Sequence, residues 1–133
     1  MIQTSYKRLL AIPAILGAIG VIVGAFGAHA LKTRVPPEAL ETIKTGVLYL
    51  FIHVLAAILA ILLHGLSGQS VWLIRSARAF LAGVILFSGS LFVIGTSSLT
   101  GLHIGMFGFI TPLGGICFIA GWTLLAVWAL RRS

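Results

Sequence analysis

The side chains that could do chemistry in this chain are few, and most of them are imidazoles. Three histidines fall in or beside apolar stretches that we expect to meet at one end of the molecule: His29, His53 and His103. Imidazole nitrogens bind zinc, copper and haem iron, so a metal or haem site is one hypothesis. However, no two of these histidines have metal-ligand spacing, and no carboxylate is placed to orient them. Separate histidines bonded to backbone or lipid headgroups are the simpler interpretation, and we predict no cofactor.

A polar stripe leads to one of these histidines. Glu41, Thr45, Tyr49 and His53 recur every four residues, so one helix would carry them on a slowly drifting face. Two interpretations stay open. The stripe is either an interfacial tyrosine with a histidine bonded to a neighbouring helix, or the lining of a binding or transport site for a metal, lipid, quinone or small solute. The candidate ligand residues are His29, Tyr49, His53, His103 and Glu41.

Other kinds of catalysis find little support. The chain contains no Asp, and its two glutamates, Glu38 and Glu41, lie close together on an expected exposed turn rather than across a cleft. Ser88 and Ser90 have no base near them in the sequence. The glycines of residues 17–24 do not form a phosphate loop, because such a loop follows a strand and these lie within an apolar helix. We therefore expect no enzyme.

The composition indicates the solvent that surrounds the chain. Of its 133 residues, 59% are hydrophobic and only 8% are charged, whereas a soluble domain has about 25% charged residues. The formal net charge is +7, but the basic residues stand singly or in pairs at the ends of apolar segments. This distribution is typical of membrane topology signals and headgroup contacts, so the expected partner is the lipid bilayer and not a nucleic acid.

Four apolar stretches are long enough to cross a bilayer, which takes about 20 residues for a hydrocarbon core of about 30 Å. We predict spans at about 9–31, 45–65, 79–95 and 110–130, with a short interfacial helical turn before the second. The predicted fold is an all-α membrane protein, a bundle of four transmembrane helices in a single domain over residues 1–133. The uncharged linker at 96–109 either lies at the interface or re-enters the membrane.

The first span is the one around which we expect the bundle to pack. Its glycines recur at spacings of three and four, which brings them to one helix face and permits close backbone approach between helices. We expect this face to associate with a second copy or with another membrane protein, so that Gly24→Leu breaks the association. The predicted helix-packing residues are Gly17, Gly20, Gly24, Gly27, Ala28, Gly89, Gly114 and Gly121.

An even number of spans puts both termini on one side of the membrane. Positive residues are commoner on the cytoplasmic side, so the more basic side is predicted to be cytoplasmic. The side with the termini carries Lys7, Arg8, Arg75, Arg78, Arg131 and Arg132, and the other side carries Lys32, Arg34 and Lys44.

The residues also resemble a known family. Residues 24–32, GAFGAHALK, are similar to the signature of the domain of unknown function 423 family, whose animal relative is transmembrane protein 256. The resemblance continues along nearly the whole chain, through residues 45–47, Tyr49, His53, 87–91, 110–115, Phe118, Gly121 and Trp122. This sequence departs from the family pattern around these residues. Leu50 follows Tyr49, where the family often has Gln, and Ile52 and Val54 flank His53, where the family often has an aromatic residue and Ala.

The resemblance implies a bacterial inner-membrane protein with about four spans, and it implies no particular activity. It adds weight to His29, Tyr49 and His53, which match the family motif. Together with the glycine-rich face and the shortage of reactive groups, it favours a non-enzymatic scaffold or accessory subunit. Such a subunit would pack as a homo-oligomer or with other membrane-protein subunits. The alternative is the binding or transport site built from the membrane histidines.

Overall fold

The computed structural model describes residues 4–102 and 104–131, and these form helices joined by short connections. Four helical segments are long and apolar enough to cross a membrane, which confirms the predicted all-α membrane fold: Lys7–Leu31, Pro37–Leu66, Val71–Gly95 and Ile110–Leu130. The elements are α1 (Thr4–Phe26), the π-helix η1 (Gly27–Leu31), α2 (Pro37–Leu66), α3 (Val71–Gly83), the π-helix η2 (Val84–Ser88), α4 (Gly89–Gly95), α5 (Ser97–Thr100), α6 (Ile104–Phe107) and α7 (Ile110–Leu130).

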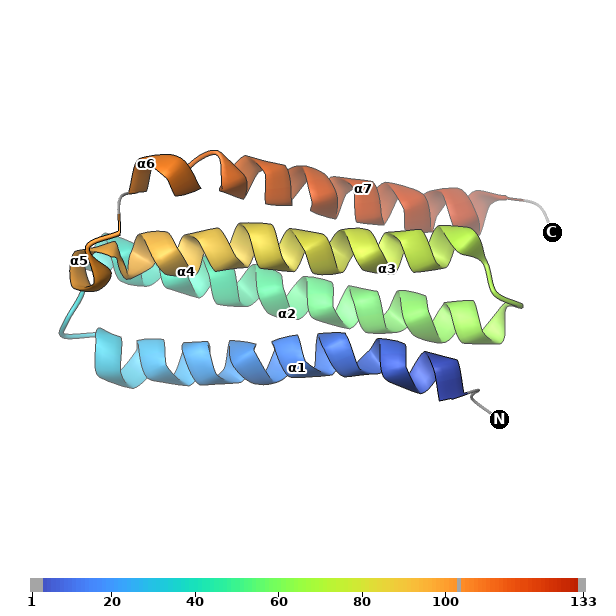
Figure 1. Cartoon of the computed structure of the whole chain (residues 1–133), viewed down its shortest axis with the longest axis horizontal. Helices are drawn as coiled ribbons and strands as arrows, with labels where there is room; N and C mark the ends of the chain where they lie inside the picture. Colours follow the sequence, from blue (N-terminus) through green and yellow to red (C-terminus); the bar gives the residue numbers. More distant parts are fainter. Residues whose placement is uncertain (1–3, 103, 132–133) are drawn as a thin grey trace.

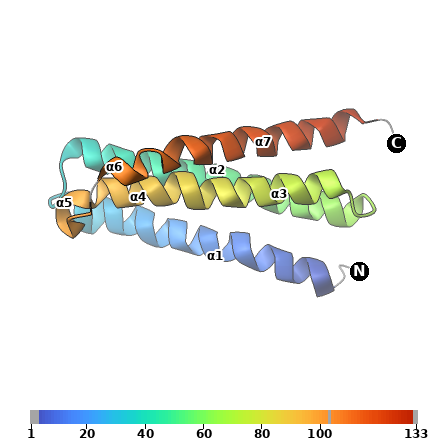
Figure 2. The same cartoon turned by 45° about the horizontal axis from the view of Figure 1, so that its top comes forward.

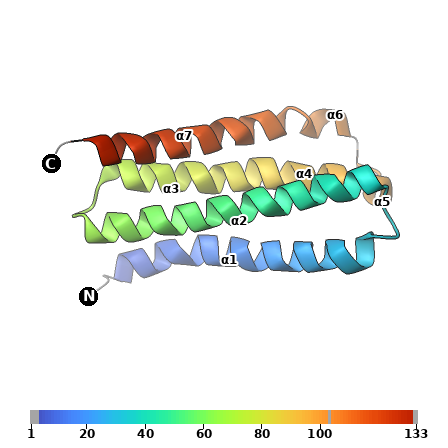
Figure 3. The same cartoon turned by 180° about the vertical axis from the view of Figure 1, so that it is seen from behind.

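The long helices lie side by side, with both chain ends at the same end of the bundle (Figure 1). The third rod is continuous, because α3, η2 and α4 follow one another without a break. This rod and α2 form the middle of the molecule, while α1 and α7 lie on opposite sides of it (Figures 2 and 3). The connection from η1 to α2 and the short α5 lie at the end away from the termini.

Two helices begin earlier than hydropathy predicts. α2 begins at Pro37, a favoured first position, with Glu38 in its positive first turn. The predicted interfacial turn is therefore the start of α2 itself. α3 begins at Val71, so residues 71–78, which lie before the predicted span at 79–95, are also helical. Arg75 and Arg78 on this segment are exposed. Hydropathy marks the part of a helix that suits lipid, and the helix itself extends beyond that part.

The centre of the bundle is α2 rather than the first span. The main core joins buried side chains of α2, α3, η2 and α7, among them Val54, Phe80 and Phe118. Within the apolar window of each span, 44% of residues are buried in α2 and only 11% in the first span. The expectation that the bundle packs around residues 9–31 is therefore wrong. Glycines allow close approach, but they bring no side chains into a core.

The glycine face of α1 is nevertheless a packing face, and its partner is α2 of the same chain. A Cβ placed on Gly17 would lie 3.8 Å from Val54, one on Gly24 would lie 3.4 Å from Val47, and one on Gly20 would lie 2.5 Å from Leu50. Gly27 follows in the same way, 3.5 Å from Ile43, whereas Ala28 is exposed. Because this face is occupied within the chain, Gly24→Leu would disturb the contact between α1 and α2. It does not test association between chains.

The other predicted packing glycines divide into two kinds. A Cβ on Gly114 would collide with the backbone of Phe87, and one on Gly121 would lie 2.5 Å from the ring of Phe80. Both positions therefore need a glycine for close helix contact. At Gly89 a Cβ would meet no atom within 4 Å. Among the described contacts, the packing role that we predicted for Gly89 has no basis.

Candidate functional site

The polar centre of the molecule is His53, which lies among aromatic rings where α2, α3, η2 and α7 meet. We call this group the aromatic cluster; it consists of Tyr49, His53, Phe80, Phe87, Phe118 and Trp122. His53 is only 4% exposed, whereas Tyr49 and Trp122 reach the surface of the bundle at 38% and 44%. The histidine is thus enclosed within the span, and the two residues with polar tips lie at the edge of the cluster.

Both ring nitrogens of His53 are engaged. Nδ1 lies 2.7 Å from the carbonyl oxygen of Tyr49, one helical turn earlier. A carbonyl only accepts, so Nδ1 carries the proton and donates it. Nε2 is then the acceptor, and it receives the indole N–H of Trp122 at 3.2 Å. This pair of bonds assigns the neutral Nδ1–H tautomer and joins α2 to α7.

The rings hold the imidazole in place by stacking. The ring centroids of His53 and Phe118 lie 3.5 Å apart, with an angle of 10° between the two ring planes. On the α3 side, the rings of Phe80 and Trp122 meet edge to face at 4.9 Å, a geometry that aromatic pairs prefer. A glycine faces each large ring, because a Cβ on Gly83 would strike Phe118 and one on Gly121 would strike Phe80. Each of the helices α3 and α7 thus places a glycine against a phenylalanine ring of the other.

Hydroxyl groups add further bonds between the helices. Ser76 Oγ on α3 donates to the carbonyl oxygen of Gly121 on α7 at 2.8 Å. Ser88 Oγ on η2 donates to the carbonyl oxygen of Gly46 on α2 at 2.7 Å. Ser90 Oγ on α4 and Thr111 Oγ1 on α7 lie 2.6 Å apart. Within residues 4–102 and 104–131, every buried side-chain nitrogen or oxygen that is described has a hydrogen-bond partner.

The structure does not gather the predicted ligand residues into one site. His29 is exposed on η1. Gly17 of α1 lies beside Val54, the residue after His53, so the level of His53 along the first span is close to Gly17 and far from His29. At 1.5 Å per residue, twelve residues of helix separate those levels by about 18 Å. Glu41 is exposed and paired with Lys44 at 2.6 Å, and His103 lies outside the described residues. Among the residues described, no group of three metal-binding side chains occurs.

Sequence reasoning placed His53 and Tyr49 on one stripe but missed the residues that hold them. Trp122 appears in the sequence analysis only as a position of the family resemblance, yet its indole N–H bonds to His53. Phe118 carried no polar signal at all. Ser88 and Ser90, weighed in the sequence as nucleophiles, instead bond to neighbouring helices, and Ser76, which the sequence analysis did not single out, does the same. A small polar residue beside a glycine on a neighbouring span is the signal that could have indicated this role.

Comparisons with known proteins place this architecture in a family. A family model described as "Protein of unknown function (DUF423)" matches residues 23–115. The UPF0382 inner membrane protein YgdD of Escherichia coli (strain K12) is 38% identical over 125 residues, which is 94% of this chain and 91% of that protein. The UPF0382 membrane protein YwdK of Bacillus subtilis (strain 168) is 38% identical over 122 residues, 88% of this chain and 94% of that protein.

A UPF0382 membrane protein of Haemophilus influenzae is 34% identical over 127 residues, 96% of this chain and 97% of that protein. No solved structure shows a significant match. The family model covers most of the chain, and the relatives align with it almost from end to end. This integral membrane protein therefore belongs to the DUF423 family of membrane proteins.

Proposed function

We propose that this protein is a non-enzymatic scaffold or accessory subunit of the membrane, which packs with a second copy or with another membrane protein. The observation that supports the proposal most is the use of His53. Its two nitrogens bond to Tyr49 and Trp122 and so hold α2 against α7. The hydroxyls of Ser76 and Ser88 likewise donate to carbonyl oxygens of neighbouring helices. Polar groups in the spans thus serve cohesion between helices, which suits a rigid structural unit.

The outward face of α1 is the surface that we assign to docking. Its exposed large residues recur at spacings of three and four, the pattern of a helix seam that packs against another helix. Exposed alanines at 11, 14, 18 and 25 lie beside them, with the exposed Val21 between the last two, so the ridge of large side chains lies next to a row of mostly small ones. Ridges and rows of this kind fit together between spans. The ridge consists of Ile12, Ile15, Ile19, Ile22 and Phe26.

The orientation follows from the charges at the two ends of the bundle. The end that carries the termini holds five described basic residues, and the other end holds three: Lys7, Arg8, Arg75, Arg78 and Arg131 against Lys32, Arg34 and Lys44. The positive-inside rule therefore favours cytoplasmic termini. The relative in Escherichia coli is named an inner membrane protein, and we propose the same membrane for this chain.

The docking face can be tested by native mass spectrometry of the protein extracted gently from its own membrane. The double variant Ile15→Ala, Ile19→Ala truncates the ridge away from the core, since both residues are exposed at 60% and 42%. Leu55→Ala, Leu59→Ala is the matched control, with the same spacing on exposed positions of α2. The proposal predicts loss of the associated mass in the ridge variant only. An unassociated wild-type chain, or equal behaviour of the two variants, would contradict it.

A further inference from the structure

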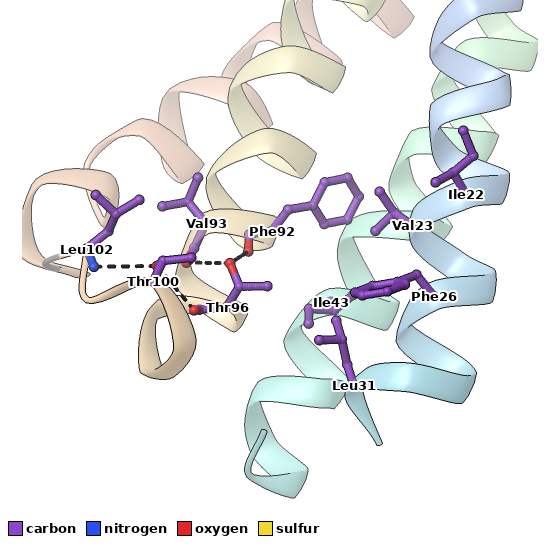
Figure 4. A pocket seen from close by; sticks show the side chains of 10 residues that line it. All are labelled: Ile22, Val23, Phe26, Leu31, Ile43, Phe92, Val93, Thr96, Thr100 and Leu102. Carbon is purple, nitrogen blue, oxygen red and sulfur yellow. Dashed lines mark hydrogen bonds between the residues drawn. The ribbon is translucent and has the colours of Figure 1, made fainter. Parts of the chain in front are cut away.

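A groove runs between α1 and α4 at the end of the bundle away from the termini, with a volume of about 360 Å³. Ile22 and Phe26 of α1 form one wall, Phe92 and Thr96 form the other, and Ile43 of α2 lies between them (Figure 4). We call it the α1–α4 groove. Its lining is almost wholly apolar, and the hydroxyl of Thr96 is already bonded to the carbonyl oxygen of Phe92 at 2.8 Å. The groove therefore suits an apolar occupant.

The groove has the length of one lipid leaflet. It extends along α1 and η1 from Ile22 to Leu31, and nine residues of helix span about 13 Å. Half of a hydrocarbon core of about 30 Å is close to that length. Ile22 is 67% exposed and Phe26 is 55% exposed, so the groove opens sideways toward the surrounding lipid. A groove of about 360 Å³ with this length fits a flexible hydrocarbon chain.

Positive charge lies where the groove reaches the end of the bundle. Lys32 follows Leu31 directly, Arg34 comes two residues later, and both are exposed. Neither forms an ion pair with any residue in the described part of the chain. The start of α1 and the end of α7 lie at the opposite end of the bundle (Figure 1).

We infer that the α1–α4 groove binds one acyl chain of an anionic glycerophospholipid. The lipid belongs to the leaflet at the η1–α2 end, and its phosphate lies against Lys32 and Arg34. Burial of methylene groups in the groove supplies affinity at about 0.8 kcal/mol per CH₂ relative to water. Ordinary bilayer lipid competes for that gain, so selectivity comes from the headgroup and the two cations. The groove shares Ile22 and Phe26 with the docking ridge proposed above, but Ile15 and Ile19, the residues truncated in the docking test, do not line it, so the two tests are separable.

The experiment uses the full chain, stripped of lipid in detergent and mixed with phosphatidylglycerol or phosphatidylcholine of identical acyl chains. Native mass spectrometry then counts the lipids retained per chain. We expect one phosphatidylglycerol per chain to be held about tenfold more strongly than phosphatidylcholine, because the two basic residues attract its net negative headgroup, whereas the choline cation neutralises the phosphate of phosphatidylcholine. Lys32→Gln, Arg34→Gln should remove this preference. Lys7→Gln, Arg8→Gln removes the same charge at the opposite end and should leave the preference intact.

A second pair of variants tests the groove itself. Ile22→Trp replaces an exposed aliphatic side chain that lines the groove by a bulkier indole. Ile15→Trp makes the same change two turns away on the same helix face. We expect the first variant to lose the retained lipid and the second to keep it. Equal lipid retention in both, or equal affinity of the wild type for the two lipids, would overturn the inference. Loss of a dimer mass with lipid unchanged in Ile22→Trp would overturn it too, because a second copy would then occupy the groove.

Discussion

Two adjacent glycines on α7 provide the sharpest test of how this bundle is packed. Gly114 faces η2 so closely that an added Cβ would lie 2.6 Å from Phe87 Cβ and 2.7 Å from its Cα. Gly115, one residue later, has no atom within 4 Å of the same position. The variants Gly114→Ala and Gly115→Ala therefore add the same methyl group to neighbouring residues of α7. In the first variant the methyl group collides with η2, and in the second it meets no atom within 4 Å.

The expected magnitudes follow from that geometry. Alanine is better than glycine in a helix by about 1 kcal/mol, so Gly115→Ala should leave the free energy of unfolding unchanged or raise it by up to about 1 kcal/mol. At Gly114 the colliding atoms belong to a backbone and cannot rotate away. Overpacking costs about 1–3 kcal/mol, and relief by separation of α7 from η2 would also strain the contact between Ser90 and Thr111. We expect a loss of about 2 kcal/mol or more.

The assay is equilibrium unfolding of both variants in mixed detergent micelles with increasing sodium dodecyl sulfate, followed by loss of helical structure. Correct folding before the titration is checked by the native mass and by gel filtration. The reasoning predicts that the two variants move in opposite directions from the wild type, or that only Gly114→Ala moves. If both variants are equally stable, the close contact between α7 and η2 is not real.

Three further outcomes are expected. Gly20→Leu should detach α1 from α2 and lower the free energy of unfolding, since even a Cβ there meets Leu50, whereas Gly17→Ala should be neutral or stabilising; limited proteolysis and unfolding check both. Trp122→Phe leaves Nε2 of His53 without its donor and should cost about 0.6–2 kcal/mol in the same micelle titration, while Trp128→Phe serves as the control and equal losses would argue against the bond. A reporter active only in the cytoplasm should work when fused to either terminus, and a working fusion in the η1–α2 connection instead would reverse the orientation.

The four spans were predictable because length and hydropathy are local properties of the chain. The limits of α3 were not, because Arg75 and Arg78 end the apolar stretch without ending the helix. The central position of α2 was also hidden, since it depends on which side chains the neighbouring helices bring to it. The glycine stripe of the first span lies against α2 in the structure. Its partner could not be deduced, because a small face accepts a helix from the same chain or from another one equally well.

The site shows the same division. The spacing of Tyr49 and His53 placed them on one helix face, and their contact through the Tyr49 carbonyl confirms it. The indole of Trp122 lies 69 residues away from His53 in the sequence, and nothing local indicates that bond. Likewise, the packing of a glycine of α3 against a ring of α7, and of a glycine of α7 against a ring of α3, depends on which two helix faces are in contact. A single sequence shows each face but not which faces meet.

The measurement that tests the central claim most directly is the native mass of the wild-type protein, extracted gently from its own membrane. The scaffold account predicts a mass equal to a multiple of the chain, or to the chain plus a second membrane protein, and it predicts loss of that mass in Ile15→Ala, Ile19→Ala. A monomer that carries only lipid in the wild type, across mild detergents and before any variant is made, would contradict the account.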